Sequence, residues 1–234
     1  MALPKLNNAR YDIVIPSTGK TISYRPYLVK EEKILMMAME TNDEKQIMNA
    51  TKDIIKSCVH DDINIDELAM FDVETLFLAL RSKSVGESID LSMKCEHCNA
   101  TNDVKINFED IKSPEVVEEN ATVMLTDSVG ITLKYPSYSV VSSAQTKDNE
   151  LDAAFDLMLA SIDTIFDNDG VYPAYKEKAE DLKDFMDSLN TEQLAKISDF
   201  FSTMPTLSYD IAYKCSSCDE HNSQELRGLS SFFT

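Results

Sequence analysis

The feature that most constrains this chain is a short phrase that occurs twice, 120 residues apart. The first copy contains Asp90, Cys95, Cys98 and Asn102, and the second contains Asp210, Cys215, Cys218 and Asn222. In both copies the aspartate, the Lys-Cys-x-x-Cys sequence and the asparagine fall in the same register. This pattern is typical of a zinc knuckle, in which a strand ends in a tight turn whose two thiolates face one metal ion.

A single knuckle supplies two ligands, whereas a structural zinc site needs four. We therefore predict that the two knuckles share one structural Zn²⁺ per chain, held by Cys95, Cys98, Cys215 and Cys218. Four protein ligands leave no open coordination position, which argues against catalytic zinc.

Two other interpretations of the cysteines stay open. The pairs could be reduced thiol turns without a metal. They could also be redox sites, which is disfavoured because thioredoxin-like pairs lie at a helix N-terminus rather than between strands. We expect His97 and His221 to face solvent rather than to replace a cysteine ligand.

Composition describes an ordinary globular protein. The chain has 234 residues, 43% hydrophobic and 27% charged, enough to bury a substantial core. No apolar run approaches the roughly 18–20 residues of a membrane span, and the N-terminal segment lacks the apolar core of a secretory signal. We expect a soluble protein made in the cytosol without stable membrane insertion. In that compartment, a paired CxxC more often binds metal or acts in redox chemistry than forms a structural disulfide.

The formal net charge of −19 is unevenly distributed, because residues 1–60 carry a net charge of +2 while residues 61–146 and 147–234 carry −10 and −11. Binding to a nucleic-acid backbone normally requires a basic face. We therefore expect no nucleic-acid partner. The acidity serves either solubility or the steering of basic protein partners.

The order of sequence patterns predicts an α+β fold, with a helical body, β-hairpins and a zinc-ribbon-like element formed by the two distant knuckles. We expect one domain over residues 1–234, made of a hairpin (about 11–26), helices (about 28–84), knuckle 1 with its strands (about 88–108), a hairpin (about 122–135), helices (about 149–204), and knuckle 2 with a tail (about 207–234). Outside the knuckles we find no internal repeat.

Several helix boundaries can be predicted more closely. Thr41 or Asn42 is expected to cap the second helix, and Asn190 the last one. The region 149–204 is expected to hold helices over 149–166, 175–189 and 191–204.

Other candidate sites fail on their spacing. The acidic stretch 163–170 resembles a calcium loop, but Ile165 and Lys176 would fall on ligand positions. The segment 17–20 lacks P-loop spacing and joins two strands. Three histidines, two of them beside the knuckles, give no convincing catalytic triad. We therefore expect neither catalytic nor cofactor-binding residues, and no enzyme activity.

Four segments together resemble the baseplate hub proteins of T-even-like contractile-tailed bacteriophages. They are 15–20 with 25–33, knuckle 1, 162–167 with 171–174, and the Phe-Phe-x-Thr-Met-Pro-x-Leu phrase 200–207, which leads into knuckle 2 and the tail 226–233. The resemblance implies a late viral protein that is either built into the baseplate hub or aids its assembly. It also implies other baseplate and hub proteins as partners, with a location in the host cytoplasm during assembly and in the virion. The oligomeric state is not implied.

One rival function remains, that of a zinc-ribbon accessory factor acting on host transcription or replication proteins. The tail is also open to two interpretations, because its aromatic residues could fold back onto the core or project into a neighbouring protein.

Overall fold

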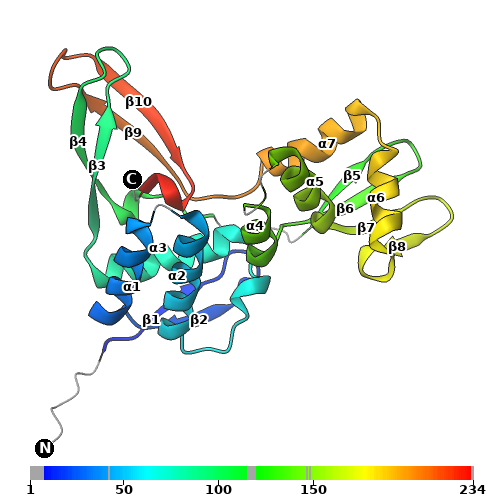
Figure 1. Cartoon of the computed structure of the whole chain (residues 1–234), viewed down its shortest axis with the longest axis horizontal. Helices are drawn as coiled ribbons and strands as arrows, with labels where there is room; N and C mark the ends of the chain where they lie inside the picture. The colour runs from blue at the N-terminus through cyan, green and yellow to red at the C-terminus, as the bar shows by residue number, and fades with distance from the viewer. Residues whose placement is uncertain (1–7, 42, 115–119, 146, 148, 233–234) are drawn as a thin grey trace, which may run out of the picture. The chain divides into compact units, whose positions relative to one another are not determined.

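The computed structural model describes residues 8–41, 43–114, 120–145, 147 and 149–232. Helices and strands are both present and all paired strands are antiparallel, so the prediction of a mixed fold is confirmed. The chain divides into two compact units (Figure 1). Unit 1 comprises Met1–Ile65, Phe71–Val116 and Thr206–Thr234, and unit 2 comprises Asp66–Met70 and Val117–Pro205. The single domain expected over 1–234 stays a prediction.

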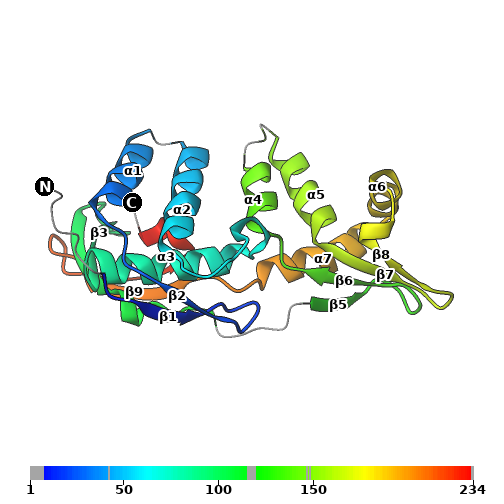
Figure 2. The same cartoon turned by 90° about the horizontal axis from the view of Figure 1, so that it is seen from below.

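Unit 1 begins with a β-hairpin and a helical layer, followed by two further hairpins. Its elements are β1 (Tyr11–Val14), β2 (Thr21–Tyr24), α1 (Val29–Glu40), α2 (Glu44–Cys58), α3 (Met70–Ser84), β3 (Ser88–Lys94), β4 (Thr101–Asn107), η2 (Phe108–Asp110), β9 (Ser208–Lys214), β10 (His221–Arg227) and η4 (Leu229–Phe232). Figure 2 shows α1 and α2 side by side with α3 beneath them.

Helix α3 is the central helix of unit 1, as its apolar sequence predicts. Phe77, Leu76 and Leu80 are at most 2% exposed. Its first turns also hold two buried carboxylates. Asp72 accepts hydrogen bonds from the Ser17 backbone N–H (2.9 Å) and hydroxyl (2.6 Å), which attaches the β1–β2 turn to the helix.

Glu74 attaches the C-terminal tail to the same helix. It accepts from the backbone N–H of Leu229 (2.9 Å) and the hydroxyl of Thr206 (3.3 Å). Gly228 makes the bend into the tail at φ 73°, a backbone conformation that favours glycine. Phe232 follows and is fully buried. The tail therefore folds back onto the core as far as Phe232, while Phe233 lies outside the described residues.

The cap of α2 differs from the prediction. The capping residue is Asp43, which accepts from the backbone N–H groups of Lys45 (2.9 Å) and Gln46 (3.3 Å). Thr41 instead donates to the Ala38 carbonyl at the end of α1, and Asn42 lies outside the described residues. An aspartate directly before the helix is favoured because its charge also interacts well with the positive helix N-terminus.

Unit 2 is a four-stranded antiparallel sheet with helices. The sheet order is β5 (Asn120–Met124), β6 (Gly130–Lys134), β7 (Ile162–Phe166) and β8 (Val171–Pro173). The other elements are α4 (Tyr138–Ala144), α5 (Glu150–Ser161), η3 (Ala174–Lys176), α6 (Ala179–Asp187) and α7 (Thr191–Ser202), while η1 (Ile65–Glu67) spans the boundary between the units. One apolar core joins this sheet to α6 and α7 through Leu125, Ile131, Leu133, Ile162, Met186, Ile197 and Phe200.

Two of the predicted helices in this region are wrong in extent. The helix expected over 149–166 ends at Ser161, and Ile162–Phe166 forms β7. Its β-branched and aromatic residues suit a strand, and a glycine faces Phe166 across the β6–β7 pair. A Cβ on Gly130 would lie 2.3 Å from the Phe166 ring, so the ring occupies the space above the glycine.

The helix expected over 175–189 begins only at Ala179, after the edge strand β8 and a short 3₁₀ turn. Helix α4 was not predicted. The last helix is confirmed: Asn190 and Gln193 form a reciprocal capping box, with both hydrogen bonds at 2.9 Å.

The expectation of no repeat outside the knuckles is wrong, because the order of elements occurs twice. Each copy has a β-hairpin, two helices, a segment that pairs with the hairpin, a further helix, a knuckle hairpin and a 3₁₀ turn. In both copies the segment after the second helix pairs with the second strand of the hairpin. This pairing is the Tyr24–Val59 bridge in the first copy and the β6–β7 pair in the second. The knuckle strands match at a constant offset of 120 residues, β3 with β9 and β4 with β10, whereas η1 occurs only in the first copy and β8, η3 and α6 only in the second.

Glu74 provides a pH test of the tail attachment. Burial raises the pKa of Glu74 despite the hydrogen bonds that it accepts. A raised folded-state pKa contributes stability that is present below the unfolded pKa, about 4.3, and lost as pH rises through the folded value. We expect Glu74→Gln to gain stability relative to the unaltered protein as pH rises through this window, measured by denaturant unfolding at several pH values. A stability difference that does not change with pH would contradict this.

Phe232 provides a test of the tail packing. Truncation by Phe232→Ala should lower the free energy of unfolding of unit 1 by about 3–5 kcal/mol, because it leaves a cavity in the core. The control is Met37→Ala on α1, where the side chain is 68% exposed and the change should stay within about 0.5 kcal/mol. Equal effects of the two substitutions in denaturant unfolding would rule out the packing described for the tail.

Candidate metal centre

The two knuckle hairpins, β3–β4 and β9–β10, have the same local structure. In knuckle 1 the Cys95 N–H donates to the Ala100 carbonyl (2.9 Å), and in knuckle 2 the Cys215 N–H donates to the Glu220 carbonyl (2.9 Å). Each turn closes through a residue with positive φ, Asn99 at 60° and Asp219 at 61°. Asparagine and aspartate tolerate this conformation better than other non-glycine residues, which explains how the turn forms without glycine.

The two hairpins pack against each other through one apolar face each. Leu91 and Ile106 of the first hairpin and Ile211 and Leu226 of the second are at most 6% exposed and belong to one buried cluster. The Tyr213 hydroxyl also donates to the Lys94 carbonyl (2.9 Å). Figure 1 shows the hairpins side by side in unit 1. This packing brings the two cysteine turns together at the same end.

The four cysteine sulfurs form one cluster, all within 4.8 Å of one another. Two distances join the knuckles, Cys95 Sγ to Cys218 Sγ at 3.7 Å and Cys98 Sγ to Cys215 Sγ at 3.6 Å. A tetrahedron with metal–sulfur bonds of about 2.3 Å has edges of about 3.8 Å. The cluster therefore has dimensions that fit a single tetrahedral metal ion.

Backbone amides point at every sulfur of the cluster. Cys95 accepts from the amides of His97 (3.4 Å) and Cys98, and Cys215 from those of Ser217 (3.4 Å) and Cys218. The amide of Ala100 donates to Cys98, and that of Glu220 to Cys218. Such donors stabilise thiolates, the form of cysteine that binds metals.

These surroundings divide the four thiols into two classes. Backbone hydrogen bonds from Ser217 and Cys218 lower the pKa of Cys215 to about 6. At Cys95, burial acts to raise the pKa of the thiol. Hydrogen bonds from the backbone amides of Cys98 and His97 outweigh burial, so the pKa of Cys95 is lowered. The pKa of Cys218 rises to about 12, and that of Cys98 is also raised, because neighbouring thiols outweigh the one amide that donates to each. In the absence of metal, the cluster therefore holds protons on Cys98 and Cys218 at neutral pH.

The other sequence candidates lie elsewhere. His97 and His221 are exposed, as expected, and among the described residues the one group with metal-ligand geometry contains neither. In the calcium-like stretch, Asp167 Oδ1 accepts from the amides of Asp169 and Gly170 (both 2.8 Å), which makes it the turn between β7 and β8. Residues 17–20 form the β1–β2 turn.

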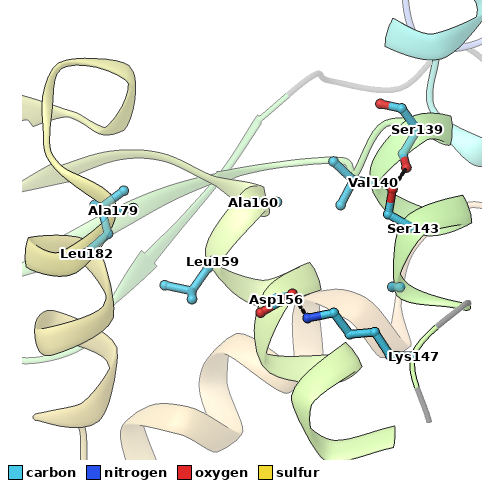
Figure 3. Close-up of a pocket in the computed structure, with 10 residues that line it drawn as sticks. Ser139, Val140, Ser143, Lys147, Asp156, Leu159, Ala160, Ala179 and Leu182 are labelled. Carbon is cyan, nitrogen blue, oxygen red and sulfur yellow. Dashed lines mark hydrogen bonds and ion pairs between the residues drawn. The ribbon is translucent and has the colours of Figure 1, made fainter. Parts of the chain in front are cut away.

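Unit 2 contains a cavity of about 450 Å³ between α4, α5 and α6 (Figure 3). Its walls include Val140, Leu159 and Leu182, and its charged groups, Lys147 and Asp156, form an ion pair. Ser143 donates to the Ser139 carbonyl within α4. The ten described residues that line it include neither histidine nor cysteine.

Comparison with protein families finds a match to the family described as T4 bacteriophage base plate protein, over residues 8–234. The chain belongs to this family. For this baseplate protein, the family indicates a structural, non-enzymatic role in the phage particle and contacts with other phage proteins. Comparison with curated proteins and with solved structures finds no match. Within the described residues, no helix is both long and apolar enough to cross a membrane.

Proposed function

We propose that this baseplate protein acts in the central hub of a contractile phage tail, through protein–protein contacts and without catalysis. The family match over residues 8–234 carries the proposal. The resemblance of four separate segments to hub proteins supports the hub assignment. The protein would be made in the host cytoplasm and join other baseplate and hub proteins there.

We further propose that Cys95, Cys98, Cys215 and Cys218 bind one structural Zn²⁺, which makes the two knuckles a zinc-ribbon-like element. The all-thiolate ligand set suits zinc, and the distances of 3.6 and 3.7 Å between knuckles suit a tetrahedral site. The ion would join segments 120 residues apart and so stabilise unit 1.

Metal analysis combined with one substitution tests the zinc site. The purified protein should contain about one zinc per chain. Cys215→Ser should release it and lower the melting temperature by about 10 °C, since a ligand at 1,000 times its Kd contributes about 4 kcal/mol. The control is Ser217→Ala, an exposed side chain between the same two cysteines. A metal-free wild type that melts at the same temperature as Cys215→Ser would contradict the proposal.

The thiol pKa values also predict how metal affinity depends on pH. Zinc must displace the protons held by Cys98 and Cys218, so each displaced proton increases the apparent affinity about tenfold per pH unit. We expect an increase of at least about 100-fold per pH unit near neutrality, steepening below pH 6 where Cys215 also takes up a proton. Chelator competition at several pH values measures this. An affinity that is constant across neutral pH would mean that the thiols are already ionised.

The hub role can be tested in infected cells. The tagged protein should co-purify with other baseplate proteins, and electron microscopy of the captured material should show hub or baseplate intermediates. Its presence in purified virions would identify a permanent component, whereas its presence in intermediates alone would identify an assembly factor. Co-purification with host transcription or replication proteins instead would favour the accessory-factor alternative.

A further inference from the structure

Two asparagines outside the ligand set lie at equivalent positions of the two knuckle hairpins. Asn102 is on β4 and Asn222 on β10, at the constant offset of 120 residues. Both are buried, with 7% and 5% of their surface exposed. A buried amide side chain is costly unless its donor and acceptor groups find partners.

Each asparagine finds these partners in the turn of the opposite knuckle. Asn102 Oδ1 accepts from the backbone N–H (2.8 Å) and hydroxyl (2.9 Å) of Ser216, and Asn222 Oδ1 accepts from the backbone N–H of Glu96 (2.9 Å). Ser216 and Glu96 are the residues that directly follow the first cysteine of each knuckle.

The amide nitrogens reach the sulfurs of the same turns. Asn102 Nδ2 lies 3.7 Å from Cys215 Sγ, and the Asn222 side chain donates to the Cys95 sulfur. Each Nδ2 also donates within its own hairpin, to the carbonyl of Ala100 (3.0 Å) or of Glu220 (3.2 Å). The contacts are therefore reciprocal, since each hairpin holds the first cysteine of the other.

We infer that Asn102 and Asn222 are positioning residues that hold the two cysteine turns in register and donate to the metal-bound sulfurs. This inference rests on the proposed metal site. Asparagine suits the position because it offers an acceptor for the opposite amide and a donor for the sulfur on one short side chain. Aspartate would keep the acceptor but place a negative charge against a thiolate.

The first test measures metal retention in the full chain loaded with Co²⁺. Outer-shell groups of this kind contribute about 10–100-fold to metal affinity. We expect Asn102→Ala and Asn222→Ala each to weaken Co²⁺ binding by this factor in chelator competition and to shift the thiolate-to-cobalt charge-transfer bands. Asn102→Asp, which keeps the acceptor and so preserves the turn, should weaken binding at least as much.

The control is Asn107→Ala, also on β4, where the side chain is exposed and bonds to Asp110. It should leave affinity and spectrum unchanged. Wild-type affinity and spectrum in Asn102→Asp and Asn222→Ala would overturn the inference.

A second readout needs no metal and separates this inference from the proposed zinc site. In the metal-free protein, amide hydrogen exchange should become faster at Glu96 in Asn222→Ala and at Ser216 in Asn102→Ala, each on the knuckle opposite to the substitution. If the wild type does not bind metal, the proposed metal site is wrong. The faster exchange on the knuckle opposite to each substitution is still expected in that case. Unchanged exchange at both amides would overturn the reciprocal bracing itself.

Discussion

The contact between the two knuckle hairpins is the interaction on which unit 1 depends. Leu91 and Ile106 of one hairpin bury against Ile211 and Leu226 of the other, in the same cluster that holds Phe232 of the tail. Each buried aliphatic side chain contributes about 1.5–3 kcal/mol. Because the hairpins come from segments 120 residues apart, this contact also carries a loop-closure cost. The cysteine cluster lies at the end of this interface, where a single ion can stabilise it further.

The duplicated order of elements gives the cluster its internal symmetry. Both knuckles have the same turn hydrogen bonds, the same positive-φ position and the same buried asparagine. The copies nevertheless differ in where the knuckle packs, because knuckle 2 follows α7 of unit 2 in sequence but belongs to unit 1. The two hairpins therefore form a symmetric, cross-braced element of unit 1.

Local signals in the sequence predicted much of the fold and the whole cysteine set. The start of the knuckle 1 hairpin near residue 88 and the Asn190 cap followed from the sequence pattern and capping chemistry. The doubled Cys-x-x-Cys spacing identified the four sulfurs that the structure brings together. Ile162–Phe166 was assigned wrongly because a short apolar run fits a helix or a strand, and pairing with β6 decides between them. The role of Asn102 and Asn222 also depended on tertiary structure. The sequence shows that the two asparagines occupy equivalent positions, but only the structure shows that each one contacts the cysteine turn of the opposite hairpin.

We propose that one metal ion joins the two knuckles through the four thiolates of Cys95, Cys98, Cys215 and Cys218. X-ray absorption spectroscopy of the purified protein at the zinc edge measures this ligand set directly. We predict a single shell of four sulfurs at about 2.3 Å, with no nitrogen or oxygen in the first shell. A shell containing nitrogen or oxygen, or a protein without bound metal, would contradict a shared site of four thiolates.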